Sequence, residues 1–92
     1  MTYQSKGLFI GGKWQAASGG AFEDYNPSTG QVWASIPNAT RADAAAAIEA
    51  AHKAFPAWAA MPFVARAALL NKAAALIEAR QQDFVAAIGP EI

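Results

Sequence analysis

The sequence predicts an α+β segment in which short antiparallel strands come first and two helices follow. Six of the seven glycines and two of the three tryptophans lie before residue 38, among short apolar runs separated by turn signals. Beyond residue 42 the sequence is rich in alanine, and larger apolar residues recur at helical intervals. We therefore expect strands and turns over about residues 8–37, a helix over about 41–55 and a second helix over about 62–88.

The first two strands are predicted to form a hairpin. Residues 8–10 are a short apolar run, and residues 13–16 return as the second strand. Gly11 and Gly12 stand between them, and glycine readily takes the positive φ angles of a two-residue hairpin turn. After a glycine-rich loop, residues 21–25 are expected to form a third extended run.

A strong turn signal at residues 26–30 precedes the last strand. Asparagine can bond its own backbone, proline presets φ and glycine supplies the exit. Residues 31–36 then alternate in character, which predicts a half-buried strand that ends at Pro37. Its two faces are expected to carry Val32, Ala34 and Ile36 on one side and Gln31, Trp33 and Ser35 on the other.

Thr40 is the predicted N-cap of the first helix, and Asp43 three residues later is a near match to a capping box. Pro56 is expected to end this helix because proline has no amide hydrogen, which leaves Trp58 in the connection. The helix is predicted to carry one apolar stripe, formed by Ala44, Ile48, Ala51 and Phe55.

Pro62 is well placed as the first residue of the second helix, and Gly89 with Pro90 is a stop signal. The apolar positions of this helix are Phe63, Leu69, Leu70, Ala73, Leu76, Ile77, Phe84 and Ile88.

Composition excludes several kinds of function. Seven basic residues balance seven acidic ones, so there is no electrostatic footprint for nucleic acid or an anionic membrane surface. The absence of cysteine excludes a disulfide, a thiolate metal site and a cysteine nucleophile within this sequence. No apolar run reaches the roughly 18 residues of a transmembrane helix. We expect a cytoplasmic protein without nucleic-acid or membrane partners.

The residues that could carry chemistry have simpler explanations. His52 lies on a predicted helix without a supporting nucleophile or carboxylate, so we interpret it as a surface residue. Glu23 and Asp24 are adjacent in a strand and must face opposite sides. The glycine pairs do not fit a phosphate-binding fingerprint. We therefore predict no catalytic and no cofactor-binding residue in this sequence.

The predicted core is small for a domain that stands alone. Alanine supplies 25 of the 92 residues and buries little surface. The backbone entropy that opposes folding is on the order of 1–2 kcal/mol per residue. We expect both helices and at least one strand edge to pack against more protein, and the sequence to be an incomplete portion of a domain.

Read in order, the motifs resemble the amino-terminal portion of the NAD(P)-dependent aldehyde dehydrogenase superfamily. The family opens with Phe-Ile-x-Gly-x-Trp, an Asn-Pro-x-Thr-Gly turn, an alanine-rich helix ending Ala-Phe before a tryptophan, and a helix beginning near Arg-x-x-x-Leu. The resemblance spans about residues 8–88. It rests on residues 8–14, Phe22, residues 25–30, 32–37 and 44–55, Trp58 and residues 66–70.

The resemblance implies that residues 1–92 are the N-terminal portion of the cofactor-binding domain of a larger α/β aldehyde dehydrogenase fold. Family members oxidise an aldehyde to a carboxylic acid with NAD or NADP, through a cysteine nucleophile and a glutamate that activates water. Those residues lie downstream in the family. This chain alone is therefore expected to be inactive, and the resemblance also implies that the parent enzyme is a homodimer or homotetramer.

Two finer expectations also come from the resemblance. Some family members bind a monovalent cation through backbone carbonyls just before the Asn-Pro turn, a place that Tyr25 occupies. The alanine-rich helices look most like bacterial enzymes for aromatic aldehydes, such as benzaldehyde, vanillin or salicylaldehyde dehydrogenases. Residues 88–92 depart from the family's usual Glu-x-Gly after the second helix.

A function of a different class stays open. The chain could be a free-standing helix and hairpin module that has no enzymatic activity and docks on a partner protein. Its docking faces would be Ile48 with Phe55 on the first helix, and Leu70, Ile77 and Phe84 on the second.

Overall fold

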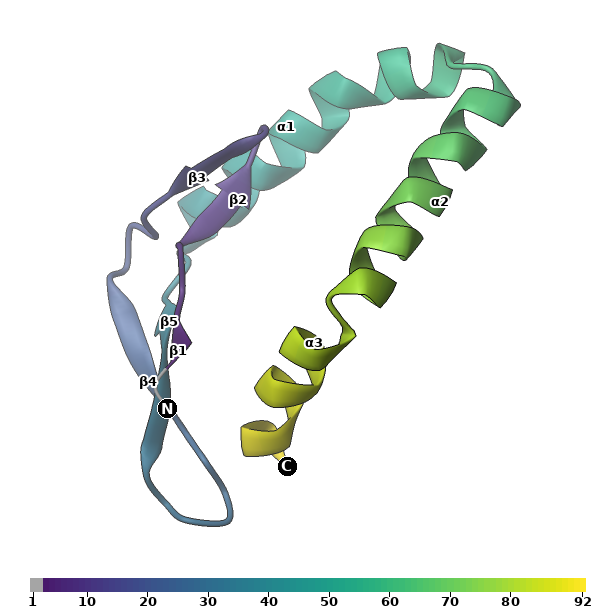
Figure 1. Ribbon diagram of the computed structural model, residues 1–92. Helices are drawn as coiled ribbons and strands as arrows, with labels where there is room; N and C mark the ends of the chain where they lie inside the picture. Colours follow the sequence, from purple (N-terminus) through teal and green to yellow (C-terminus); the bar gives the residue numbers. More distant parts are fainter. Residues whose placement is uncertain (1–2) are drawn as a thin grey trace.

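The computed structural model describes residues 3–92, with side chains from Ser5 onward. The strands are β1 (Tyr3–Gln4), β2 (Leu8–Ile10), β3 (Lys13–Gln15), β4 (Ala21–Tyr25) and β5 (Val32–Pro37). The helices α1 (Arg41–Ala60), α2 (Phe63–Ala79) and α3 (Gln81–Ile88) follow, and a 3-10 turn, η1 (Gly89–Glu91), ends the chain (Figure 1). The predicted α+β order, with paired short strands before helices, is confirmed.

Both predicted antiparallel pairs form. β2 and β3 make a hairpin with Leu8 opposite Gln15, and the turn glycines have φ values of 61° and 79°. β4 pairs with β5, and the register shifts between Asp24 and Tyr25. β1 adds to the other edge of β5 as a parallel strand, which the sequence analysis missed because two residues are too short to show a period.

The turn at residues 26–30 has the predicted chemistry. The Asn26 side chain accepts from the backbone N–H of Ser28 at 2.8 Å, which is an Asx turn. The Gly30 N–H donates to the Asn26 carbonyl at 2.8 Å, and Gly30 takes a φ of 73°. The loop therefore closes on its own hydrogen bonds and holds β4 beside β5.

The predicted end of the first helix at Pro56 is wrong, because α1 continues through Trp58 to Ala60. Proline removes one backbone donor, but the residues that follow are mostly alanine, the best helix former. The last turn is closed by the Met61 N–H, which donates to the Trp58 carbonyl at 3.1 Å.

The second predicted helix is divided, and it begins after Pro62 rather than at it. α2 ends at Ala79 and α3 starts at Gln81, with Arg80 between them at φ −110° and ψ 24°. The Arg80 carbonyl accepts from the N–H of Asp83 at 3.0 Å, and the Arg80 Nε contacts the Asp83 carboxylate at 3.2 Å. Arg80 thus closes one helix and starts the next, and an acidic residue in the first turn of α3 suits its dipole.

The buried face of β5 also differs from the prediction. Trp33 and Ala34 are buried at 7% and 0% exposure, although they point to opposite faces, while Val32 is 40% exposed. β5 is the central strand of its sheet and has covered faces near its middle. Val32 lies at its start, beside the register shift and the turn, where less of the chain covers it.

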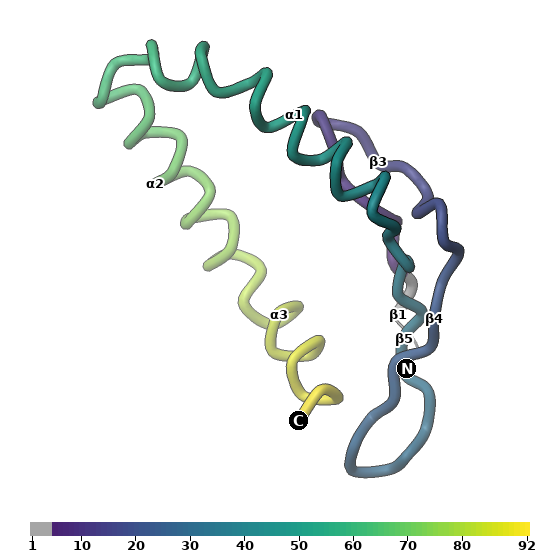
Figure 2. The backbone as a smooth tube through the Cα atoms, turned by 180° about the vertical axis from the view of Figure 1, so that it is seen from behind, coloured from purple at the N-terminus to yellow at the C-terminus, as the bar shows by residue number. Residues whose placement is uncertain are grey.

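The helices form an open arch rather than a closed core. α1 runs away from the strands, and α2 with α3 returns so that the chain end lies near the β4–β5 turn (Figures 1 and 2). The radius of gyration is 16.6 Å and the accessible surface is 7242 Å². A compact chain of this length would have about 12 Å and about 5,100 Å². Roughly 2,000 Å² is therefore exposed beyond what a finished domain of this size shows.

The predicted stripe of α1 is split between two environments. Ala44 and Ala51 of the stripe, together with Ala47 outside it, border shallow cavities shared with the β2–β3 hairpin, and an added Cβ at Gly11 would lie 3.9 Å from the Ala50 Cβ. Small residues here permit close approach of helix and hairpin. Large apolar side chains remain exposed along all three helices: Ile48, Phe55, Trp58, Phe63, Val64, Leu69, Leu70, Leu76, Ile77, Phe84, Val85 and Ile88.

Candidate functional site

The most densely bonded polar cluster lies where α1 begins. One oxygen of the buried Asp43 carboxylate accepts from the Ser18 N–H, the Ser18 hydroxyl and the Thr40 N–H, each at 2.9 Å. The Thr40 hydroxyl accepts from the Asp43 N–H at 3.3 Å, which completes the capping box. Aspartate therefore serves where glutamate or glutamine was expected for a full capping box.

This cluster is built to hold structure rather than to react. The backbone N–H of Thr40, and after it the donors of Ser18, hold the pKa of Asp43 below its ordinary value. Ser18 is 2.6 Å from the Thr40 hydroxyl, but no histidine stands near to take its proton. The cluster fastens the loop after β3 to the start of α1. The sequence analysis found Thr40 and Asp43 but missed Ser18, whose partner is 25 positions away.

A second polar group lies on β4 and meets the end of the chain. Glu23 and Asp24 face opposite sides, as predicted: Glu23 accepts from the Tyr25 hydroxyl at 2.9 Å, and Asp24 accepts from Trp33 Nε1 at 3.0 Å. The Glu23 hydrogen bond raises the pKa of the Tyr25 phenol. A hydrogen bond with Asp24 raises the pKa of Glu91, so η1 lies close to β4.

Two cavities flank these groups. One of 340 Å³ lies between the β4–β5 turn and the last helices, with Asn26, Trp33 and Pro90 in its wall. The other, of 550 Å³, lies between the hairpins beside Lys6 and Trp14, and the Lys6 ammonium is 5.8 Å from the Trp14 ring centre. Neither wall pairs a nucleophile with a base. Within residues 3–92 no group of three histidine, cysteine or acidic residues is placed to hold a metal ion.

The remaining candidates of the sequence analysis are dispersed. His52 is exposed on α1, and the glycine pair at 11 and 12 forms a turn. Gly19 donates its N–H to the Asn38 carbonyl at 3.1 Å, which ties the second glycine-rich loop to the end of β5. No helix within residues 3–92 combines the length and hydrophobicity that a membrane crossing demands.

Comparison with known proteins identifies the class. The model of the aldehyde dehydrogenase family matches residues 14–92. The chain belongs to the aldehyde dehydrogenase family, as the ordered motifs indicated.

Three relatives place the chain within that family. It is 43% identical over 88 residues to N-succinylglutamate 5-semialdehyde dehydrogenase 2 of Caulobacter vibrioides, and the matched region covers 95% of this chain and 18% of that protein. It is 42% identical over 87 residues to 2-aminomuconic semialdehyde dehydrogenase of Danio rerio, where the match covers 95% of this chain and 18% of the relative. It is 42% identical over 84 residues to the N-succinylglutamate 5-semialdehyde dehydrogenase of Burkholderia multivorans, where the match covers 91% of this chain and 17% of the relative.

The chain thus spans less than a fifth of the length of these relatives. Their names refer to semialdehydes, so they lend no support to the expectation of an aromatic-aldehyde enzyme.

Proposed function

We propose that residues 1–92 are the N-terminal structural segment of an enzyme that oxidises an aldehyde to a carboxylic acid with NAD or NADP. The observation that carries this proposal is the excess of roughly 2,000 Å² of exposed surface in a chain that matches only 18% of a relative. An area of this size is typical of an obligate interface. The remainder of the polypeptide would cover it, as part of the cofactor-binding domain.

The chemistry of this enzyme would lie outside residues 1–92. The chain has no cysteine, and its glycines do not form a dinucleotide fingerprint before a helix, so the residues present do not fit NAD or NADP. Their contribution would be to support the part of the protein that does bind it. We therefore propose that the chain alone is inactive and that the complete protein is a homodimer or homotetramer.

The substrate class proposed is a semialdehyde. The names of the relatives favour a semialdehyde, whereas the resemblance of the alanine-rich helices favoured an aromatic aldehyde. Both classes can be assayed side by side with the same enzyme preparation. Benzaldehyde and N-succinylglutamate 5-semialdehyde are the two diagnostic substrates.

We also propose that the backbone carbonyl of Tyr25 contributes to a monovalent cation site whose other ligands would come from the remainder of the polypeptide. Carbonyl and carboxylate oxygens are the ligands that hard cations prefer. Thermal stability of the complete gene product that rises with potassium or sodium is the expected result.

The proposal of an enzyme segment is tested with the complete product of the gene that encodes residues 1–92. That product should form NADH or NADPH from an aldehyde, and the 92-residue chain should form neither. A gene that encodes only these residues, together with a stable complex between the chain and another protein, would instead support the free-standing interaction module. NADH formed by the 92-residue chain alone would contradict both functions.

A further inference from the structure

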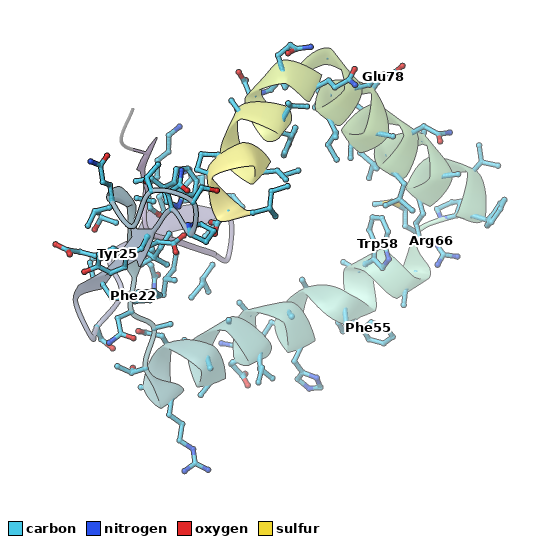
Figure 3. The ribbon with its side chains drawn as sticks, turned by 90° about the horizontal axis from the view of Figure 1, so that it is seen from below. Phe22, Tyr25, Phe55, Trp58, Arg66 and Glu78 are labelled. Atoms are coloured by element: carbon cyan, nitrogen blue, oxygen red, sulfur yellow. The ribbon has the colours of Figure 1, made fainter. Side chains whose placement is uncertain are left out.

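One buried donor in the bend between α1 and α2 has no acceptor. Among the described side chains, the Nε atom of Arg66 is buried and makes no hydrogen bond. Arg66 lies in the first turn of α2, and Figure 3 shows it at the bend beside the end of α1, where Trp58 and Phe55 project from opposite sides of that helix. The buried Nε therefore lies at the corner where α1 meets α2.

A buried N–H donor without an acceptor is costly, so native structures almost always supply one. The planar fork of Arg matches a carboxylate, which it binds through two parallel hydrogen bonds. Arg80 shows the contrast, because it is exposed and already contacts Asp83 at 3.2 Å. The flexible stem of Arg66 allows Nε to turn toward an incoming group when the bend is covered.

We propose that Arg66 anchors a carboxylate from the remainder of the same polypeptide, at the point where that remainder packs into the bend between α1 and α2. This inference rests on the proposed function. Three observations select this occupant over others: the buried Nε without an acceptor, the roughly 2,000 Å² of surface to be covered, and relatives about five times longer than the chain. The position of Trp58 beside the bend would exclude water from the pair and strengthen it.

The test replaces Arg66 or Arg80 with lysine, whose amine can be coupled covalently to a neighbouring carboxylate. In the complete gene product, Arg66→Lys is treated with a zero-length carbodiimide, and cross-linked peptides are identified by mass spectrometry. We expect position 66 to link to an Asp or Glu beyond residue 92 of the same molecule. The matched control is Arg80→Lys, which should link to Asp83.

Several results would overturn the proposal. If the control links and position 66 links to nothing, or only to an acidic residue within 1–92, no external carboxylate binds there. If mixed isotope labels show that position 66 links between two molecules, the occupant is a second copy. The cross-link does not depend on catalysis, so an inactive product that still shows it would refute the proposed function and leave the anchor in place.

A second measurement needs no substitution. In the unmodified gene product, phenylglyoxal should modify Arg66 more slowly than in the 92-residue chain by about tenfold or more, because a charge-assisted pair must open first. Arg80 should react at similar rates in both. Equal rates at Arg66 in the two proteins would refute the anchor.

Discussion

The sharpest prediction concerns Gly7, which lies just before β2. Gly7 has a φ of 101°, and an added Cβ would lie 2.3 Å from the Gln15 carbonyl oxygen. Gly12 is the matched control, since it has a φ of 79° but nothing within 4 Å of an added Cβ. Gly7→Ala therefore combines conformational strain with a collision against backbone, whereas Gly12→Ala has the strain alone.

The expected magnitudes differ enough to separate the two causes. A left-handed conformation costs an ordinary residue about 1–2 kcal/mol. The collision at Gly7 forces the start of β2 and the end of β3 apart, and we expect a total of about 3 kcal/mol or more. As an increase in local opening, this corresponds to about a hundredfold or more for Gly7→Ala, against roughly fivefold to thirtyfold for Gly12→Ala.

Hydrogen exchange of the β2 and β3 amides in the complete gene product measures this local opening. Amides of α2 serve as an internal reference, because that helix lies far along the chain from the hairpin. Equal acceleration by the two substitutions would refute the reasoning, since it would mean that the close approach of Gly7 to Gln15 carries no energetic weight.

Three further predictions follow from the described contacts. Thr40→Ala should destabilise the start of α1 by about 0.5–2 kcal/mol, and Thr40→Ser should retain most of that stability, as measured by exchange of the first-turn amides. The hydrogen bonds that lower the pKa of Asp43 stabilise the fold while its carboxylate is ionised. This stabilisation is present above pH 3.8, the ordinary pKa of the group, and is lost as the pH falls through the lower pKa of the folded state. Acid titration of unfolding should therefore lose part of its pH dependence in Asp43→Asn. Trp33→Phe should weaken the β4–β5 pair by about 1.5–3 kcal/mol through loss of the bond to Asp24, and exchange of the β5 amides would show it.

Local chemistry made much of the fold predictable. The hairpin at Gly11, the Asn-Pro turn and the cap at Thr40 each depend on residues within a few positions of one another, and all three were found. The errors concern helix boundaries, where local effects that favour a helix compete with effects that end it. Pro56 removes one backbone donor, but the following alanines sustain the helix. Arg80 separates two helices although no glycine or proline stands there to indicate a break.

The candidate site shows the limits of sequence in a different way. Ser18, Asp24 and Glu91 acquire their roles from partners distant along the chain, so no local spacing reveals them. Arg66 is singled out by the absence of a partner, which only the packed arrangement can show. The family, by contrast, was evident from the order of short motifs, and the match over residues 14–92 confirms it.

The central claim is that the exposed apolar faces of the helices are covered by the remainder of an aldehyde dehydrogenase chain. Comparison of amide hydrogen exchange in α1 and α2 between the 92-residue chain and the complete gene product tests it most directly. The account predicts strong protection of both helices in the complete product and rapid exchange in the isolated chain. Equal, strong protection in the two would contradict it, because the helices would then need no cover beyond residues 1–92.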